Sequence, residues 1–138
     1  MRRSLADVWS RRAVVDYGLA RRATLASLFR GQSTTADVCD AHPYLLRAAK
    51  HHGEPTSKVC PVCRGERLTH VTYVYGDELG QYAGRVKQTR ELAEMAGEYG
   101  EFRVYVVEVC QGCEWNHLTL SYVLGTGEPR RRRRAADE

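Results

Sequence analysis

Apolar residues recur with helical spacing over the first third of the chain. Between residues 7 and 30 they are separated by three, four or seven positions, at Val8, Val15, Leu19, Ala26 and Phe29, and Leu25 and Leu28 widen the stripe. This spacing places them on one face of an amphipathic helix. A second helix is expected over residues 43–52, because Pro43 suits a first helical turn and Gly53 ends the pattern. We therefore predict an N-terminal helical segment over residues 1–55.

The pattern changes to alternation in the second half of the chain. Three stretches are rich in β-branched and aromatic residues, "RLTHVTYVYG" at 67–76, "FRVYVVEV" at 102–109 and "HLTLSYVL" at 117–124. Such runs predict β-strands. Residues 85–99, between the first strand and the second, return to helical spacing. The sequence thus predicts three strands with one inserted helix.

Two cysteine pairs with the same internal spacing lie beside these predicted strands. The four cysteines are Cys60, Cys63, Cys110 and Cys113. A Cys-x-x-Cys turn presents two thiolates to one ion, and two such turns complete the tetrahedral shell that zinc prefers. Pro61 is expected to stiffen the first turn and Gly112 to give the second a positive φ. We predict an α+β fold in which residues 56–126 form a zinc-ribbon-like three-stranded antiparallel sheet that holds one structural zinc ion.

Other ligand sets and other chemistry remain open at this stage. Iron in a rubredoxin-like centre, or reduced redox cysteines, would also use two Cys-x-x-Cys pairs. Cys39 and His42 lie in "CDAH" and could add ligands, but we expect a small buried thiol and a helix cap instead. His70 and His117 are candidates for hydrogen bonding to the cysteines. Because four thiolates leave no open metal position, we expect no enzyme.

The net charge of +4 is distributed unevenly along the chain. Residues 1–53 carry +5, residues 54–128 carry −4, and residues 129–138 carry +3. The basic residues that we predict could contact nucleic acid or a partner are Arg11, Arg12, Arg21, Arg22, Arg130, Arg131, Arg132, Arg133 and Arg134. Phosphates attract such basic ends without reading sequence. Residues 127–138 have no apolar periodicity and are predicted to form a disordered tail.

Three blocks resemble a small family of actinobacterial proteins known only as a domain of unknown function. They are "CDAHPYLLRAAKHHGEP", "CPVCRGE" and "VVEVCQGCEWNHLTLSYVLG", and the likeness spans roughly residues 13–125. The resemblance implies a bacterial cytosolic protein that keeps all four cysteines of the two pairs. It implies no activity.

Composition and charge lead to a functional hypothesis. The chain has no run of about 20 apolar residues and no secretory h-region, so we expect a cytoplasmic protein without membrane contact. We expect a non-enzymatic adaptor in a protein complex of the transcription or translation machinery, touching nucleic acid through its basic ends and taking no small-molecule substrate. The alternatives are a protein–protein interaction module without nucleic acid, and a zinc- or redox-responsive regulator, which requires labile ligands.

Overall fold

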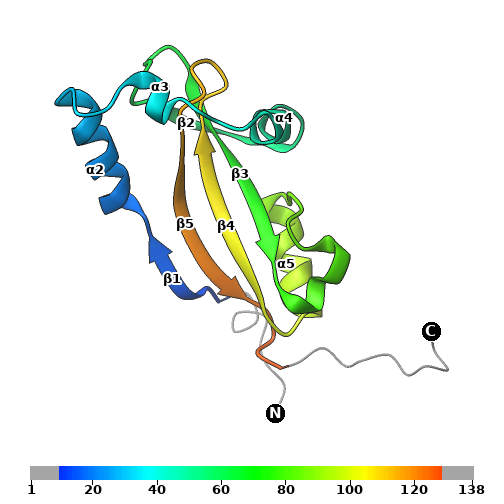
Figure 1. The fold of residues 1–138 in the computed structure, drawn as a ribbon. Helices are drawn as coiled ribbons and strands as arrows, with labels where there is room; N and C mark the ends of the chain where they lie inside the picture. The colour runs from blue at the N-terminus through cyan, green and yellow to red at the C-terminus, as the bar shows by residue number, and fades with distance from the viewer. Residues whose placement is uncertain (1–9, 129–138) are drawn as a thin grey trace.

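The computed structural model describes residues 10–128 and contains one five-stranded antiparallel sheet (Figure 1). The strands are β1 (Arg12–Asp16), β2 (Glu54–Val59), β3 (Arg67–Tyr75), β4 (Phe102–Val109) and β5 (Asn116–Leu124), and their order across the sheet is β1-β5-β4-β3-β2. The three predicted strands are present as the central β3, β4 and β5. The predicted three-stranded sheet is nevertheless too small, because an edge strand is added on each side.

The helices lie along and beyond this sheet. They are α2 (Gly18–Phe29), α3 (Thr35–Val38), α4 (Pro43–His52), a 3-10 helix η1 (Asp77–Tyr82) and α5 (Thr89–Glu98). The predicted helix over residues 43–52 is confirmed as α4, and the predicted inserted helix corresponds to the shorter α5. Among residues 10–128, none of these helices has the length and apolarity needed to cross a bilayer.

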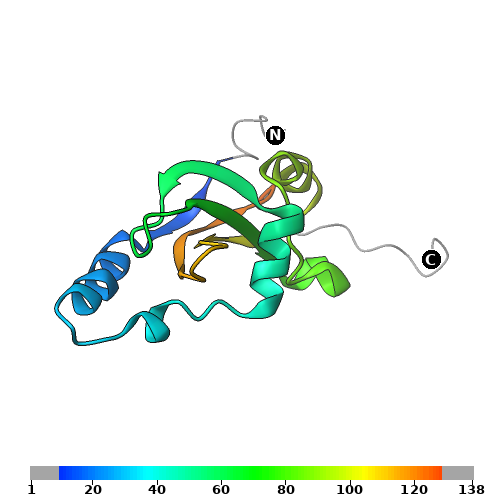
Figure 2. The same ribbon diagram turned by 90° about the horizontal axis from the view of Figure 1, so that it is seen from above.

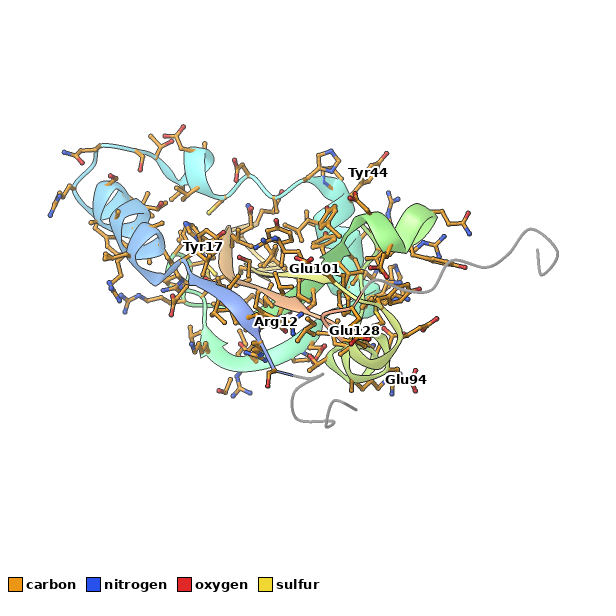
Figure 3. The ribbon with its side chains drawn as sticks, turned by 90° about the horizontal axis from the view of Figure 1, so that it is seen from below. Arg12, Tyr17, Tyr44, Glu94, Glu101 and Glu128 are labelled. Carbon is orange, nitrogen blue, oxygen red and sulfur yellow. The ribbon has the colours of Figure 1, made fainter. Side chains whose placement is uncertain are left out.

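The helix predicted over residues 7–30 is wrong in its first half. The described chain begins with a strand, β1, which pairs antiparallel with β5, and α2 starts only at Gly18. β1 follows the edge of β5 between Arg12 and Tyr17, which Figure 3 labels. The β-branched pair Val14 and Val15 suits an extended backbone, and β5 supplies the hydrogen-bond partners. Asp16 then ends the strand, because its Oδ1 accepts a 2.7 Å hydrogen bond from the backbone N–H of Gly18.

Only part of the apolar stripe predicted for this segment, Leu25 and Leu28, faces the core. Val15, Leu19 and Phe29 are 43%, 64% and 65% exposed. The side chain that α2 buries is Leu25, with Leu28 partly buried beside it. The observed strand accounts for Val15, since a residue in an extended segment no longer shares the face of the helix that follows. Within α2, the face that packs on the sheet is that of Leu25 and Leu28, and Leu19 and Phe29 lie off it.

The second edge strand, β2, was not predicted. It pairs with β3 between Glu54 and Val59, although Pro55 removes one backbone donor from it. This proline is compatible with a strand at the edge of the sheet, where one side of the backbone needs no partner. β2 carries the chain directly from α4 into the first cysteine pair.

The two faces of the sheet pack against different helices. Val71 and Val74 are three residues apart on β3 and therefore point to opposite faces. Val71 packs with Ala49 of α4. Val74 packs with Leu92 of α5 in the larger core cluster. Figure 2 shows α4 and α5 as separate helices, with the segment from α2 to α4 running past the sheet.

Local caps follow the sequence signals. Thr34 and Asp37 form a capping box at the start of α3, as the "STTAD" spacing allows. His42 is the N-cap of α4 and accepts a 3.0 Å hydrogen bond at Nδ1 from the backbone N–H of Tyr44, so the predicted cap is confirmed. The predicted disordered tail begins at Gly127, whose backbone N–H donates a 2.8 Å hydrogen bond to Gly100 O in the structure. The rest of that tail from residue 129 on, including Arg130 to Arg134, lies outside the described residues.

Candidate metal centre

Two turns at one end of the sheet carry the four cysteines. Cys60 and Cys63 lie between β2 and β3, and Cys110 and Cys113 lie between β4 and β5. Because β3 and β4 pair in register up to Thr69 opposite Val109, the two turns emerge side by side (Figure 1). All four Sγ atoms lie within 4.8 Å of one another. The sheet therefore brings together the four residues that the sequence predicted as ligands.

The spacing of the sulfurs fits a single tetrahedral ion. With zinc–sulfur bonds of about 2.3 Å, the edges of the tetrahedron are about 3.8 Å long. The observed Sγ–Sγ distances are 3.7 Å for Cys60 with Cys113 and 3.6 Å for Cys63 with Cys110. A set of four sulfurs is typical of zinc and also of tetrahedral iron centres. The residues thus fit one metal ion, and the donor set favours these two metals.

The two turns have equivalent backbone hydrogen bonds. In the first, Cys60 N–H donates to Glu66 O and Arg64 N–H donates to Cys60 O, at 2.8 and 3.1 Å. In the second, Cys110 N–H donates to Trp115 O and Glu114 N–H donates to Cys110 O, at 2.8 and 2.9 Å. These backbone hydrogen bonds close both turns and do not depend on a bound metal.

The positive φ angles fall on different residues from the one predicted. Gly112 does not have a positive φ, whereas Arg64 has φ 56° and Glu114 has φ 72°. Each of these follows the second cysteine of its pair, where the chain must reverse to enter the next strand. The prediction for Gly112 is therefore wrong, and the left-handed positions are held by residues with side chains.

Backbone N–H groups also point at the sulfurs. Val62 N–H donates to Cys60 Sγ, Gly65 N–H to Cys63 Sγ, and Cys113 N–H to Cys110 Sγ, each at 3.4 Å. Such donors stabilise the thiolate that binds a metal.

Burial and hydrogen bonding set the pKa values of the thiols in opposite directions. The bond from Gly65 N–H lowers the pKa of the exposed Cys63 to about 7. Burial raises the pKa of Cys110 and of Cys113 to about 12. At neutral pH the last two thiols keep their protons until a metal displaces them, so metal binding is expected to release protons.

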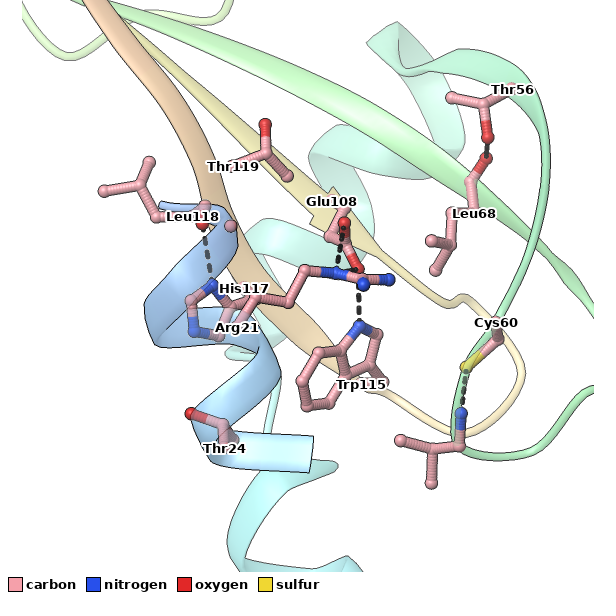
Figure 4. Close-up of polar contacts among 12 residues, drawn as sticks. Arg21, Thr24, Thr56, Cys60, Leu68, Glu108, Trp115, His117, Leu118 and Thr119 are labelled. Carbon is pink, nitrogen blue, oxygen red and sulfur yellow. Dashed lines mark hydrogen bonds and ion pairs between the residues drawn. The ribbon is translucent and has the colours of Figure 1, made fainter. Parts of the chain in front are cut away.

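A buried polar cluster supports the metal end of the sheet (Figure 4). Trp115 is fully buried and packs with Leu25 of α2, Cys60 and Cys110. Its Nε1 donates a 2.7 Å hydrogen bond to Oε2 of Glu108, a carboxylate that is only 4% exposed. Arg21 of α2 donates from Nε to both oxygens of the same carboxylate, at 3.0 and 2.9 Å. This cluster was not predicted from the sequence, because Arg21 and Glu108 are 87 residues apart.

The two histidines near the site have other contacts. His117 stacks on the Trp115 ring at 5.8 Å between centroids, and its Nδ1 lies 2.7 Å from Leu118 O. His70 is half-buried in β3 and lines a hollow of about 230 Å³ on the sheet surface. Neither histidine belongs to the cluster of four ligands.

Cys39 lies beside the cysteine cluster. It caps the C-terminal end of α3, and its Sγ is 3.6 Å from Cys113 Sγ. It does not belong to the group of four sulfurs that surround one point. Cys39 is half-buried, and burial raises the pKa of its thiol.

The described arginines that were predicted to contact nucleic acid or a partner have different contacts within the protein. Arg11 places its guanidinium 4.4 Å from the centre of the Tyr122 ring, and Arg12 donates to Gly125 O at 3.1 Å. Arg21 is bound to Glu108 as described above. Arg22 is exposed on α2. Among the described residues 10–128, Arg22 is thus the arginine of the two doublets for which the structure gives no hydrogen bond, ion pair or ring contact.

Comparisons with known proteins agree with the resemblance noted in the sequence. Residues 8–138 match the model of a family of unknown function, DUF5318. Uncharacterized proteins of Mycobacterium bovis and of two strains of Mycobacterium tuberculosis are each 50% identical over 117 residues, covering 85% of this chain and 85% of each relative. No solved structure matches the chain significantly.

Proposed function

Because the chain belongs to the DUF5318 family, whose function is unknown, we propose a function from the geometry of its cysteine cluster. One zinc ion bound by the four cysteines stabilises the end of the sheet, and the protein is a non-enzymatic adaptor. The observation that carries the metal assignment is the set of four Sγ atoms within 4.8 Å of one another. The proposed ligands are Cys60, Cys63, Cys110 and Cys113.

Two features support a structural role for the metal. Four thiolates fill a tetrahedral shell and leave no position for water or substrate, unlike catalytic zinc sites. Cys60 and Cys110 are fully buried and pack with Leu25, Leu68 and Trp115. A metal at this point connects both turns to α2, so its binding energy becomes folding energy.

The test is metal content and its dependence on each thiol. We expect the purified full chain to hold one zinc ion, measured by elemental analysis against protein concentration. Cys110→Ser should lose the ion, while Cys39→Ser should keep it. Iron instead of zinc would change the metal assignment, and a chain that binds no metal would contradict the proposal.

The adaptor role rests on exposed apolar side chains at one edge of the sheet. Val14 and Val15 on the edge strand β1 are 52% and 43% exposed. Leu19 and Phe29 on the following helix are exposed more fully. Edge strands and exposed apolar residues are features through which proteins bind other proteins. We infer that the partner is a protein complex, and we extend the proposal to the transcription or translation machinery of the cytoplasm.

Contact with nucleic acid is the second part of this proposal. It is supported by the net charge of +4, by the exposed Arg22 and by the arginine run at residues 130–134. The test is purification from native cells under mild conditions, with one half of the sample treated with nuclease. Ribosomal or polymerase proteins retained after nuclease would support the adaptor role. Binding that is unchanged by deletion of residues 129–138 together with Arg22→Ala would contradict the nucleic-acid contact and favour a protein–protein interaction module.

A further inference from the structure

A fifth sulfur lies against the proposed zinc centre. The chain has five cysteines, and the structure describes all of them as free thiols. Four surround one point, and the fifth, Cys39, places its Sγ 3.6 Å from Cys113 Sγ. That distance is as short as the distances between the proposed ligands themselves. Since one zinc ion takes four thiolates, one sulfur of this group is left without a place in the shell.

Hydrogen bonds of the next two residues hold Cys39 in this position. Ala41 N–H donates to Glu114 O at 3.1 Å, and Asn116 Nδ2 donates to Asp40 Oδ1 at 3.0 Å. Both hydrogen bonds join the segment between α2 and α4 to the end of the second cysteine turn and the start of β5. This segment runs from α2 to α4 past the cysteine end of the sheet (Figure 2). Two hydrogen bonds to residues that closely follow Cys113 therefore support the contact between the two sulfurs.

Access differs among the five sulfurs. Cys60 and Cys110 are fully buried, Cys39 and Cys113 are both half-buried, and Cys63 is exposed. A small oxidant can therefore reach both sulfurs of the pair in contact. Of the four proposed ligands, Cys60 and Cys110 are kept away from solvent.

From this arrangement we infer that Cys39 is a resolving thiol, which joins Cys113 in a disulfide when a hydroperoxide oxidises the centre, and that the metal is then released. The inference rests on the proposed function, because it requires a metal bound by Cys113. A disulfide has a sulfur–sulfur bond of about 2.05 Å, so the two Sγ atoms must approach by about 1.6 Å. Cys39 has no metal bond to break before it reacts.

The chemistry uses one hydrogen peroxide for each disulfide. The Cys113 thiolate attacks the peroxide, the O–O bond breaks, and a sulfenic acid and hydroxide form. The Cys39 thiol then gives up its proton and its sulfur attacks the sulfenic sulfur. The S–S bond forms, the S–O bond breaks, and the hydroxyl takes that proton and leaves as water. The hydroxide takes a proton from solvent. The two sulfurs lose two electrons, the peroxide is reduced to two waters, and zinc loses one of its four ligands.

The experiment follows zinc release and disulfide formation in the full-length, zinc-loaded chain. Hydrogen peroxide is added in the presence of a chromogenic chelator, and the alkylated products are mapped by mass spectrometry. We expect the wild-type chain to release its zinc as a peptide pair linking Cys39 to Cys113 forms. Thiol reductant and zinc should restore the starting state. In Cys39→Ser, release should be slower by about tenfold or more, because a sulfenic acid without a neighbouring thiol does not form this bond.

The outcomes separate this inference from the proposed function. Equal rates of zinc release in both proteins, or disulfides confined to the four ligands, would overturn the inference while leaving structural zinc in place. Loss of zinc from Cys39→Ser without oxidant would also overturn it, since Cys39 would then contribute to metal binding. A wild-type chain that takes up no zinc would contradict the proposed function itself. The disulfide map of the wild-type protein decides the pairing even if the variant folds poorly.

Discussion

Trp115 donates a 2.7 Å hydrogen bond from its indole Nε1 to Oε2 of Glu108, and both side chains are buried. Burying a carboxylate is unfavourable unless it is paired and hydrogen-bonded. Here the charge is offset by Arg21, which reaches the same carboxylate from α2. The end of the sheet that carries the four cysteines therefore holds α2 through one charged side chain as well as through Leu25.

Replacing Arg21 should destabilise the protein more than replacing its neighbour Arg22. In Arg21→Met the apolar stem is largely kept, but Glu108 is left as a buried carboxylate without its cation. Because Arg21 is partly exposed, we expect a loss of about 2 kcal/mol in the free energy of unfolding, below the range for fully buried pairs. The matched control is Arg22→Met on the exposed side of α2, which should change stability by less than about 0.5 kcal/mol. Urea denaturation of the zinc-loaded proteins measures both, and equal stabilities would contradict the role of the ion pair.

Zinc removal should be visible in the fluorescence of Trp115. The chain has two tryptophans, so the measurement is made in a Trp9→Phe background. Trp115 is fully buried beside Cys60 and Cys110, and we expect its emission to shift to longer wavelength when a chelator removes the ion. Structural zinc contributes on the order of 10 kcal/mol in small finger peptides, so loss of the ion should unfold this end of the sheet.

Cys110→Ser should reproduce the chelated state in that experiment and should not respond to added zinc. Cys39→Ser serves as the control, because this cysteine lies outside the four-sulfur group. Far-UV circular dichroism should keep part of its signal, since the core beneath α5 is a separate cluster. An unchanged emission spectrum after complete zinc removal would show that the centre does not stabilise the fold.

Replacing the residue with a left-handed backbone conformation in each cysteine turn by glycine should stabilise the protein. Glu114 and Arg64 have positive φ angles, which cost a residue with a side chain roughly 1 kcal/mol relative to glycine. Glu114→Gly and Arg64→Gly should therefore raise the melting temperature of the zinc-loaded protein. Glu66→Gly is the control, because this exposed residue does not have a positive φ and should lose stability. A lower melting temperature for both turn variants would contradict the strain argument.

The pH dependence of stability should include a contribution from His70. Burial lowers the pKa of this imidazole below 6.5, partly opposed by the charges of Glu108 and Glu54 and reinforced by Lys58. The unfolded chain then binds the proton more readily than the folded one, so stability is lost as the pH falls through about 6.5 toward the lower folded value.

The measurement compares His70→Gln with wild type at about pH 7.5 and about pH 5. The variant should lose less stability than wild type between the two values, and His51→Gln, on an exposed residue of α4, should behave like wild type. Both variants keep the same cysteine centre, so zinc loss at low pH affects all three proteins alike. An identical pH dependence in His70→Gln and wild type would contradict the contribution.

The sequence by itself determined the features that depend on neighbouring residues. Alternation located the three central strands, and the cap at His42 and the box at Thr34 followed from side chains that bond their own backbone a few residues away. The spacing of each Cys-x-x-Cys pair is equally local. It singled out the four cysteines whose Sγ atoms lie within 4.8 Å of one another, because a turn of this length places both sulfurs on one side.

The tertiary structure decided what depends on distant partners. Residues 12–16 are extended because β5 supplies their hydrogen bonds from more than 100 positions away. The β-branched pair Val14 and Val15 suits a strand, but two residues are too short a local signal to override the helical spacing around them. Arg21 was predicted to contact nucleic acid or a partner, but it binds Glu108, which is 87 residues away. Cys39 lies beside Cys113 because two hydrogen bonds fix a connecting segment to the second turn. The sequence gives the chemistry of each side chain, but contacts across the sheet form only when the whole chain buries its apolar surface.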